Sequence, residues 1–172
     1  MIIIFIIAFV LLLIDQISKM LAFGFEPSNV TVIPHILKFR LTFNTGAAFS
    51  IFDNNTLFLA LISLVMSIFI TYYIIKNDFK NNKFLAIVLA MILAGAFGNL
   101  IDRFLTVFNV IDGVVDFIDL YLFGWHFPGT FNMADVYLTI GIILLAIYIV
   151  FLSDKKKIEG EERTHERTKD NK

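Results

Sequence analysis

The sequence predicts a mainly α integral membrane protein with four transmembrane helices, a small extracytoplasmic β-sheet subdomain and an outer loop between the third and fourth helices. Hydrophobic residues make up 58% of the 172-residue chain, and its mean hydropathy is +0.81. Soluble domains are only about 45–50% apolar. Four apolar runs approach the roughly 20 residues that a helix needs to cross the hydrocarbon core. A further stretch alternates apolar and polar residues, as a half-buried strand does.

The apolar runs cover residues 2–23, 57–75, 84–101 and 136–152. The first run has neither the basic start nor the small-residue cleavage site of a secretory signal, so we expect it to remain as a permanent span. The last two runs lie at the short end of the range for a membrane helix. We expect a single four-span membrane domain at 1–153, followed by a solvated, charged cytoplasmic tail at 154–172.

Basic residues beside the spans predict the orientation, because cytoplasmic loops carry an excess of Lys and Arg. Lys76, Lys80 and Lys83 lie between the second and third runs, and three more lysines follow the fourth. Both termini are therefore expected in the cytoplasm, which leaves the loops at about 24–56 and 102–135 outside. The polar residues within the runs then gather near one level, toward the outer face.

The first outer loop is expected to contain the β structure. Residues 37–44 alternate strictly between apolar and polar side chains, and residues 30–33 form a possible shorter strand that Pro34 ends. We expect a small sheet on the outer membrane surface. The longer strand ends at Asn44 and runs into Gly46 and two alanines, small residues that allow a substrate chain to approach the backbone closely.

Asp116 and Asp135 are the leading candidates for chemistry. Asp135 begins the fourth apolar run, and Asp116 lies among apolar residues in the outer loop. Two neighbouring carboxyl groups that share one proton can activate a water molecule and protonate a leaving group. The structural alternative is that Asp135 caps its helix while Asp116 is an ordinary loop acid, and the sequence alone leaves these readings about evenly balanced.

Other polar residues also have structural readings, and for Asp15 with Lys19 the structural reading is the favoured one. Asp15 and Lys19 are four residues apart on one helix face, so we expect an ion pair that orients the first span. Asn132 precedes the fourth run as a potential N-cap. Arg103 could pair with Asp102 or Asp119, or could bind substrate carbonyls or lipid phosphate. The small residues at four-residue intervals on the third run, Ala90, Ala94 and Gly98, would let another helix approach closely.

Several classes of function are disfavoured by composition. The net charge of −1 gives no sign of nucleic-acid binding. Cysteine is absent, which removes disulfides, thiol nucleophiles and thiolate metal sites. The histidines are scattered, and His35 and His126 are expected at the surface rather than in a metal site.

Five sequence blocks together resemble the lipoprotein signal peptidases, or signal peptidase II. The blocks begin at Asp15, Asn44, Gly98, Val114 and Phe131, occur in the order of that family, and span about residues 10–150. One departure is the segment from Phe104 to Asp112, which is longer than the corresponding gap in the family. The insertion leaves the five blocks intact but affects the outer loop that would cover the site.

The resemblance implies an aspartic endopeptidase of the bacterial cell membrane, with its active site near the outer face. It implies that Asp116 and Asp135 form the catalytic dyad. It also implies a polar lining of Asn44, Asn99, Arg103 and Asn132, with Asp15 near its edge. The implied substrate is a prolipoprotein whose Cys already carries diacylglycerol, cut just before that Cys, in contact with membrane lipid. No metal or organic cofactor is implied, and we expect a monomer.

Two other classes of function are compatible with membrane acids. A small proton- or ion-coupled transporter would use them to relay charge, but it should place acids near the middle of the membrane and in a repeated half. We find no internal repeat. A purely structural membrane subunit would tolerate the replacement of Asp by Asn.

Overall fold

The computed structural model describes residues 1–25, 29–46, 55–122 and 124–152. The tail expected at 154–172 and the alanines expected after Gly46 lie outside these residues. The described chain forms four long helices, α1 (Ile2–Ala22), α2 (Thr56–Lys76), α3 (Lys83–Val107) and α4 (Met133–Ile147). A short 3-10 turn, η1 (Phe23–Phe25), extends α1, and a π-helical turn, η3 (Tyr148–Leu152), extends α4. All four helices are long and apolar enough to cross a membrane, so the predicted fold class is confirmed.

The central helix of the bundle is α3, which packs against each of the other three. In its most apolar window 67% of the residues are buried, against 28% or less in the others. The small-residue stripe meets its partners at Gly98, where an added Cβ would lie 2.5 Å from Asp15 Oδ2 of α1 and 2.9 Å from the Cβ of Ala134 of α4. The predicted close approach is confirmed, and α4 crosses α3 at this point.

The third span is longer than the sequence predicted. Helix α3 continues to Val107 rather than ending near residue 101, so the charged residues Asp102 and Arg103 lie within it. An unpaired buried charge in a membrane helix is costly, but Asp102 is paired with Lys19 of α1 at 2.9 Å. The apparent run of 18 residues therefore understates the helix because charges that pair between helices look like loop residues in sequence.

A four-stranded antiparallel sheet has the strand order β1-β2-β3-β4. The first two strands, β1 (Val30–Ile33) and β2 (Leu37–Asn44), occupy the predicted positions. The other two, β3 (Val114–Leu122) and β4 (Trp125–Phe131), arise from the segment that was expected only as an outer loop. Strand β3 lies in the middle of the sheet and is mostly buried, so it lacks the alternation that identified β2.

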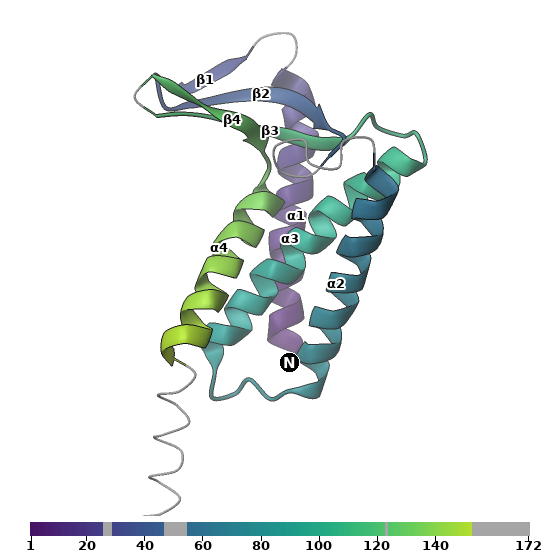
Figure 1. Ribbon diagram of the computed structural model, residues 1–172, viewed down its shortest axis with the longest axis vertical. Coiled ribbons are helices and arrows are strands. Elements are labelled where there is room, and N and C mark those ends of the chain that lie inside the picture. The colour runs from purple at the N-terminus through teal and green to yellow at the C-terminus, as the bar shows by residue number, and fades with distance from the viewer. Residues whose placement is uncertain (26–28, 47–54, 123, 153–172) are drawn as a thin grey trace, which may run out of the picture.

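The sheet covers one end of the bundle, whereas Met1, the α2–α3 connection and the end of α4 lie at the opposite end (Figure 1). An aromatic cluster seats the sheet against the end of α1. In this cluster Phe25 stacks on Phe39 of β2 at 5.4 Å between centroids, and Phe39 meets Phe117 of β3 edge-on at 5.7 Å. The packing fixes β3, and with it Asp116, directly above the ends of the helices.

Candidate active site

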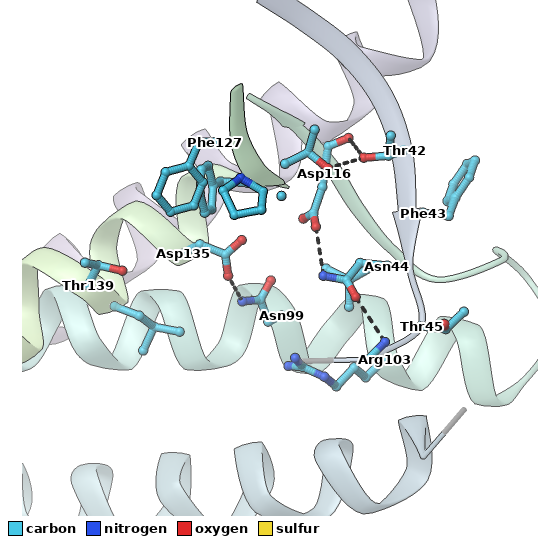
Figure 2. A pocket seen from close by; sticks show the side chains of 17 residues that line it. Thr42, Phe43, Asn44, Thr45, Asn99, Arg103, Asp116, Phe127, Asp135 and Thr139 are labelled. Atoms are coloured by element: carbon cyan, nitrogen blue, oxygen red, sulfur yellow. Dashed lines mark hydrogen bonds between the residues drawn. The ribbon is translucent and has the colours of Figure 1, made fainter. Parts of the chain in front are cut away.

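A cavity of about 950 Å³ opens where the sheet meets α3 and α4. Asp116 and Asp135 lie on either side of it with their carboxyl groups turned inward (Figure 2). The other predicted site residues that line the cavity are Asn44, Gly46, Asn99 and Arg103. Asp15 and Asn132 do not line it; both are fully buried behind its wall. Phe127, Phe131 and Leu138 give one side of the cavity an apolar surface.

Asp135 belongs to a capping box at the start of α4. The Asn132 side chain accepts a hydrogen bond from the Asp135 backbone N–H at 3.0 Å, and the Asp135 Oδ2 accepts one from the Asn132 backbone N–H at 3.1 Å. The predicted N-cap is therefore confirmed. The second carboxylate oxygen, Oδ1, accepts from Asn99 Nδ2 at 2.7 Å. Capping thus uses one oxygen of Asp135 and orients the carboxyl group toward the cavity.

Asp116 is held on β3 by two side-chain amides. Its Oδ1 accepts a hydrogen bond from Asn132 Nδ2 at 2.7 Å, and its Oδ2 accepts one from Asn44 Nδ2 at 3.1 Å. Strand pairing sets the second contact, because Asn44 lies on β2 opposite Val114, two residues before Asp116. The ordinary loop acid of the structural reading is thus a buried strand residue, exposed by only 1%.

Asn132 connects the two acids. Its Nδ2 reaches both Asp116 Oδ1 and, at 3.0 Å, the Oδ1 of Asn99, whose own amide donates to Asp135. Amide groups donate hydrogen bonds without adding charge, so they fix carboxylates in position and favour the ionised form less strongly than a cation in contact would. The chain of contacts from Asp116 through Asn132 and Asn99 to Asp135 makes one polar unit of residues from β3, α3 and α4.

The electrostatic environment of Asp116 favours its protonated form. Burial and then the neighbouring Asp135 carboxylate raise the pKa of Asp116 to about 7, against opposing hydrogen bonds from Asn44 and Asn132 and the charge of Lys19. Two acids in such a site hold one proton between them near neutral pH. One carboxyl group can then act as an acid while the other acts as a base.

Arg103 contributes a cation to the cavity wall. Its Nη1 donates to Ser63 Oγ of α2 at 3.2 Å, and its buried Nε has no hydrogen-bond partner among the described residues. The two acids that the sequence suggested as partners of Arg103 pair with other residues: Asp102 with Lys19 and Asp119 with Arg40. A buried donor without a partner is costly, so Arg103 is suited to receive an oxygen of a bound molecule.

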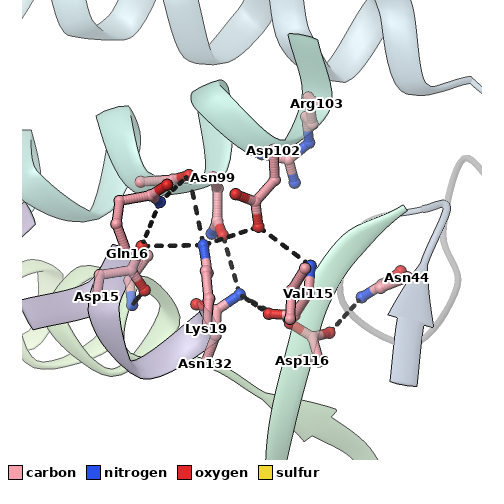
Figure 3. A network of polar contacts seen from close by, with 12 residues as sticks. Asp15, Gln16, Lys19, Asn44, Asn99, Asp102, Arg103, Val115, Asp116 and Asn132 are labelled. Carbon is pink, nitrogen blue, oxygen red and sulfur yellow. Dashed lines mark hydrogen bonds and ion pairs between the residues drawn. The ribbon is translucent and has the colours of Figure 1, made fainter. Parts of the chain in front are cut away.

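An ion triad lies behind the cavity wall (Figure 3). The expected pair of Asp15 and Lys19 is present at 2.9 Å, and Lys19 also contacts Asp102 at 2.9 Å. The side chains of all three residues are at most 4% exposed. Sequence spacing could identify the pair within α1 but not its link to Asp102, which needs two helices in contact.

A second polar cluster lies farther along β3 from the cavity. Asp119 pairs with Arg40 at 3.3 Å and with His126 Nε2 at 2.6 Å. The His126 side chain, which contacts Asp119, is 45% exposed. His35 lies in the β1–β2 turn with a positive φ of 62°. Among the described residues, no group of three or more His, Cys, Asp or Glu side chains is arranged to hold a metal ion.

Comparisons with known proteins agree with these features. A family model described as "Signal peptidase (SPase) II" matches residues 7–151. The chain is 41% identical over 126 residues to a lipoprotein signal peptidase of Staphylococcus aureus (strain JH9), which is 73% of each chain. Two solved structures of a bacterial membrane enzyme are also similar. One superposes with a TM-score of 0.73 at 38% identity over 88% of each chain. The other has a TM-score of 0.72 at 37% identity, covering 86% of this chain and 92% of its own.

Proposed function

This chain belongs to the signal peptidase II family, and from that premise we propose that it is an aspartic endopeptidase that cuts prolipoproteins just before a diacylglyceryl-modified Cys. Family membership supports the removal of signal peptides from prolipoproteins. The observation that carries the aspartic mechanism is the placement of Asp116 and Asp135 on one cavity, joined through amide contacts. We infer that the two carboxyl groups hold one water molecule between them.

In the proposed reaction the ionised carboxylate takes a proton from the water, and the water oxygen attacks the scissile carbonyl carbon. The protonated carboxyl group donates its hydrogen to the carbonyl oxygen, which stabilises the tetrahedral intermediate. The intermediate then collapses, the C–N bond breaks, and a proton passes to the departing amine. No covalent enzyme intermediate forms. The raised pKa of Asp116, about 7, keeps a proton available at neutral pH.

The proposed substrate also fits the walls of the cavity. Asn44 and Arg103 present polar groups to a peptide backbone, while Phe127, Phe131 and Leu138 offer apolar surface for acyl chains. Because the cavity lies at the end of helices that can span the membrane, acyl chains could stay in lipid while the peptide reaches the acids. Asn44 and Gly46 end β2 at the cavity, where an extended peptide can approach the backbone.

The proposed orientation places the cavity at the outer face of the bacterial cytoplasmic membrane, with both termini inside. Lys76 and Lys83 flank the α2–α3 connection, which lies at the same end of the bundle as Met1 (Figure 1). Basic residues beside spans mark the cytoplasmic side. The acids cluster at the other end, next to the sheet, rather than in the middle of the helices as a transporter would require.

The function is tested with purified protein in lipid and two matched peptides that differ only in the diacylglyceryl group on Cys. We expect cleavage of the lipidated peptide at the bond before Cys, and no cleavage by Asp116→Asn protein. Mass spectrometry identifies the cut. Cleavage at another bond, or equal cleavage of the unlipidated peptide, would contradict the substrate assignment; full activity of Asp116→Asn would contradict the mechanism.

A further inference from the structure

Two buried carboxylates attach to the backbone immediately before the two cavity acids. Asp15 Oδ1 accepts a hydrogen bond from the backbone N–H of Ala134 at 2.8 Å, and Ala134 directly precedes Asp135. Asp102 Oδ2 accepts one from the backbone N–H of Val115 at 3.1 Å, and Val115 directly precedes Asp116. Each cavity acid is therefore held by a carboxylate on a different helix, one on α1 and one on α3.

A single cation joins these two attachments. Lys19 Nζ lies 2.9 Å from Asp15 Oδ2 and 2.9 Å from Asp102 Oδ2, and it also donates to the carbonyl oxygen of Gly98 at 3.4 Å. These contacts use all three donors of the ammonium group. The Lys19 side chain is 4% exposed, so water cannot replace it. Figure 3 shows the ammonium group between the two carboxylates.

The space around Lys19 leaves the carboxylates little freedom. A Cβ on Gly98 would lie 2.5 Å from Asp15 Oδ2 and 2.9 Å from the Cβ of Ala134. Two buried carboxylates without a cation between them repel and take up a proton or separate. Separation would shift the backbone of Ala134 or Val115, and protonation would weaken the hydrogen bond that holds it.

The charged groups that face Lys19 come from every element packed around it. Asp15 is on α1, Asp102 is on α3, Asp116 is on β3 and Asp135 is on α4. Lys19 forms ion pairs with Asp15 and Asp102, whereas its positive charge acts on the cavity acids from a greater distance. Its positive charge opposes the rise in the pKa of Asp116 that burial causes.

We propose that Lys19 is a positioning residue for the hydrolysis: it locks the two carboxylates that hold the backbone before Asp116 and Asp135, and it places a positive charge near the two acids. The inference rests on the proposed function, because it assigns a role in the same reaction. Lys19 itself does not contact substrate, since it does not line the cavity.

The test compares wild-type protein with Lys19→Met, which keeps the length of the side chain and removes the charge. We expect kcat to fall about 100-fold, as for a displacement of about 1 Å in a reacting group, with KM changed by less than about twofold. The acid limb of the pH–rate profile should move to higher pH by about 0.5–1 unit, because the acids then lose a nearby cation. Lys83→Met, an exposed lysine at the far end of α3, is the matched control and should behave as wild type.

A merely structural lysine would give a loss that is equal at all pH values, and an unshifted limb would overturn the electrostatic half of the proposal. A kcat within about threefold of wild type would overturn the positioning half. Wild-type cleavage that is lost in Asp116→Asn establishes the function independently, so failure at Lys19 and failure of the proposed function are distinguishable.

A triple variant, Asp15→Asn with Lys19→Met and Asp102→Asn, decides the case if Lys19→Met does not fold. It keeps a side-chain carbonyl oxygen that can accept from the backbone N–H of Ala134 and of Val115, but the three positions of the triad no longer carry a charge. We expect it to fold and to recover kcat to within about tenfold of wild type, because the backbone attachments are restored. A folded but inactive triple variant would overturn the proposal.

Discussion

Two clusters of aspartates lie close together at the sheet end of the bundle, and they differ in what holds them. In the buried triad, Asp15 and Asp102 are each 2.9 Å from the ammonium group of Lys19. In the cavity, Asp116 and Asp135 are held by the amides of Asn44, Asn99 and Asn132, and neither has an ion pair among the described residues. A cation in contact strongly favours the charged state of an acid, whereas the neutral amides favour it less, so burial can keep a proton available on Asp116. The first arrangement suits a structural role and the second suits proton transfer.

The largest expected difference between the clusters is in activity. Asp116→Asn and Asp135→Asn should each lower kcat by about 10³-fold or more, because each removes a group that transfers a proton in the transition state. Asp15→Asn should lower it only about tenfold, since the amide still accepts from the backbone of Ala134. Cleavage rates of the lipidated peptide under single-turnover conditions provide the measurement. Equal losses at Asp15 and Asp135 would remove the functional distinction between the clusters.

The next effect is on stability and should appear in the triad. Asp15→Ala leaves the buried N–H of Ala134 unpaired and breaks one ion pair, which should cost about 3 kcal/mol. A loss of that size lowers the thermal midpoint of a chain of this length by about 6–12 °C. Thermal unfolding in detergent is the assay, with Asp15→Asn as the milder control. An unchanged midpoint would show that the triad does not stabilise the fold.

Asp116 in the cavity should lower the stability of the folded protein at neutral pH, whereas Asp15 in the triad raises it. The pKa of Asp116 is about 7 in the folded protein and about 3.9 in an unfolded chain. Between these values the folded state binds a proton that the unfolded state does not, so its stability falls as pH rises from about 4 to about 7. Asp116→Asn removes this penalty, and we expect it to be more stable than wild type by about 1–2 kcal/mol at pH 8, with no advantage at pH 4.

Thermal midpoints of both proteins across this pH range give the measurement. Asp116→Asn also removes the acceptor for one of the two amides that hold Asp116. This loss should reduce the gain in stability, so we expect less than the full pKa shift would give. A destabilised Asp116→Asn protein at pH 8 would mean that Asp116, like Asp15, is chiefly structural.

The smallest expected effect concerns Arg103, which lies in the cavity but is not one of its acids. Arg103→Ala should raise KM about tenfold for the lipidated peptide, because the unpartnered Nε would otherwise donate to a substrate oxygen. Insertion and the thermal midpoint should change little. Ser63→Ala, which removes only the contact of Arg103 with α2, is the matched control. An unchanged KM would leave Arg103 with a structural role alone.

Much of the fold follows from local sequence patterns. Apolar runs located the helices, and alternation located β2, because both patterns depend on neighbours in the chain. The pattern failed for β3, since a central strand buried on both faces carries Asp116 and Asp119 among apolar residues and does not alternate. It also ended α3 too early, because Asp102 and Arg103 look like loop residues until Lys19 and Ser63 are placed beside them.

Prediction of the site was limited in the same way, because it also depends on contacts between distant segments. The sequence indicated Asp116 and Asp135 as acids in unfavourable surroundings, and spacing indicated the cap formed by Asn132. The contact of Asn132 with Asp116 could not be inferred, because it joins α4 to a strand that was not predicted. Asp15 was expected near the edge of the site, and it lies behind the wall instead, where it holds the backbone of Ala134.

The order of the elements along the chain has a consequence for biosynthesis. Asp135 is carried by the last span, and the groups that orient the two acids come from α3, from the sheet and, through Asp15, from α1. A ribosome delivers the N-terminal segments first. Under the proposed mechanism, a nascent chain with three spans in the membrane has only half of the acid pair, and proteolysis becomes possible when the fourth span docks. On this proposal, a peptidase whose second acid lies on the fourth span is inactive until that span has inserted.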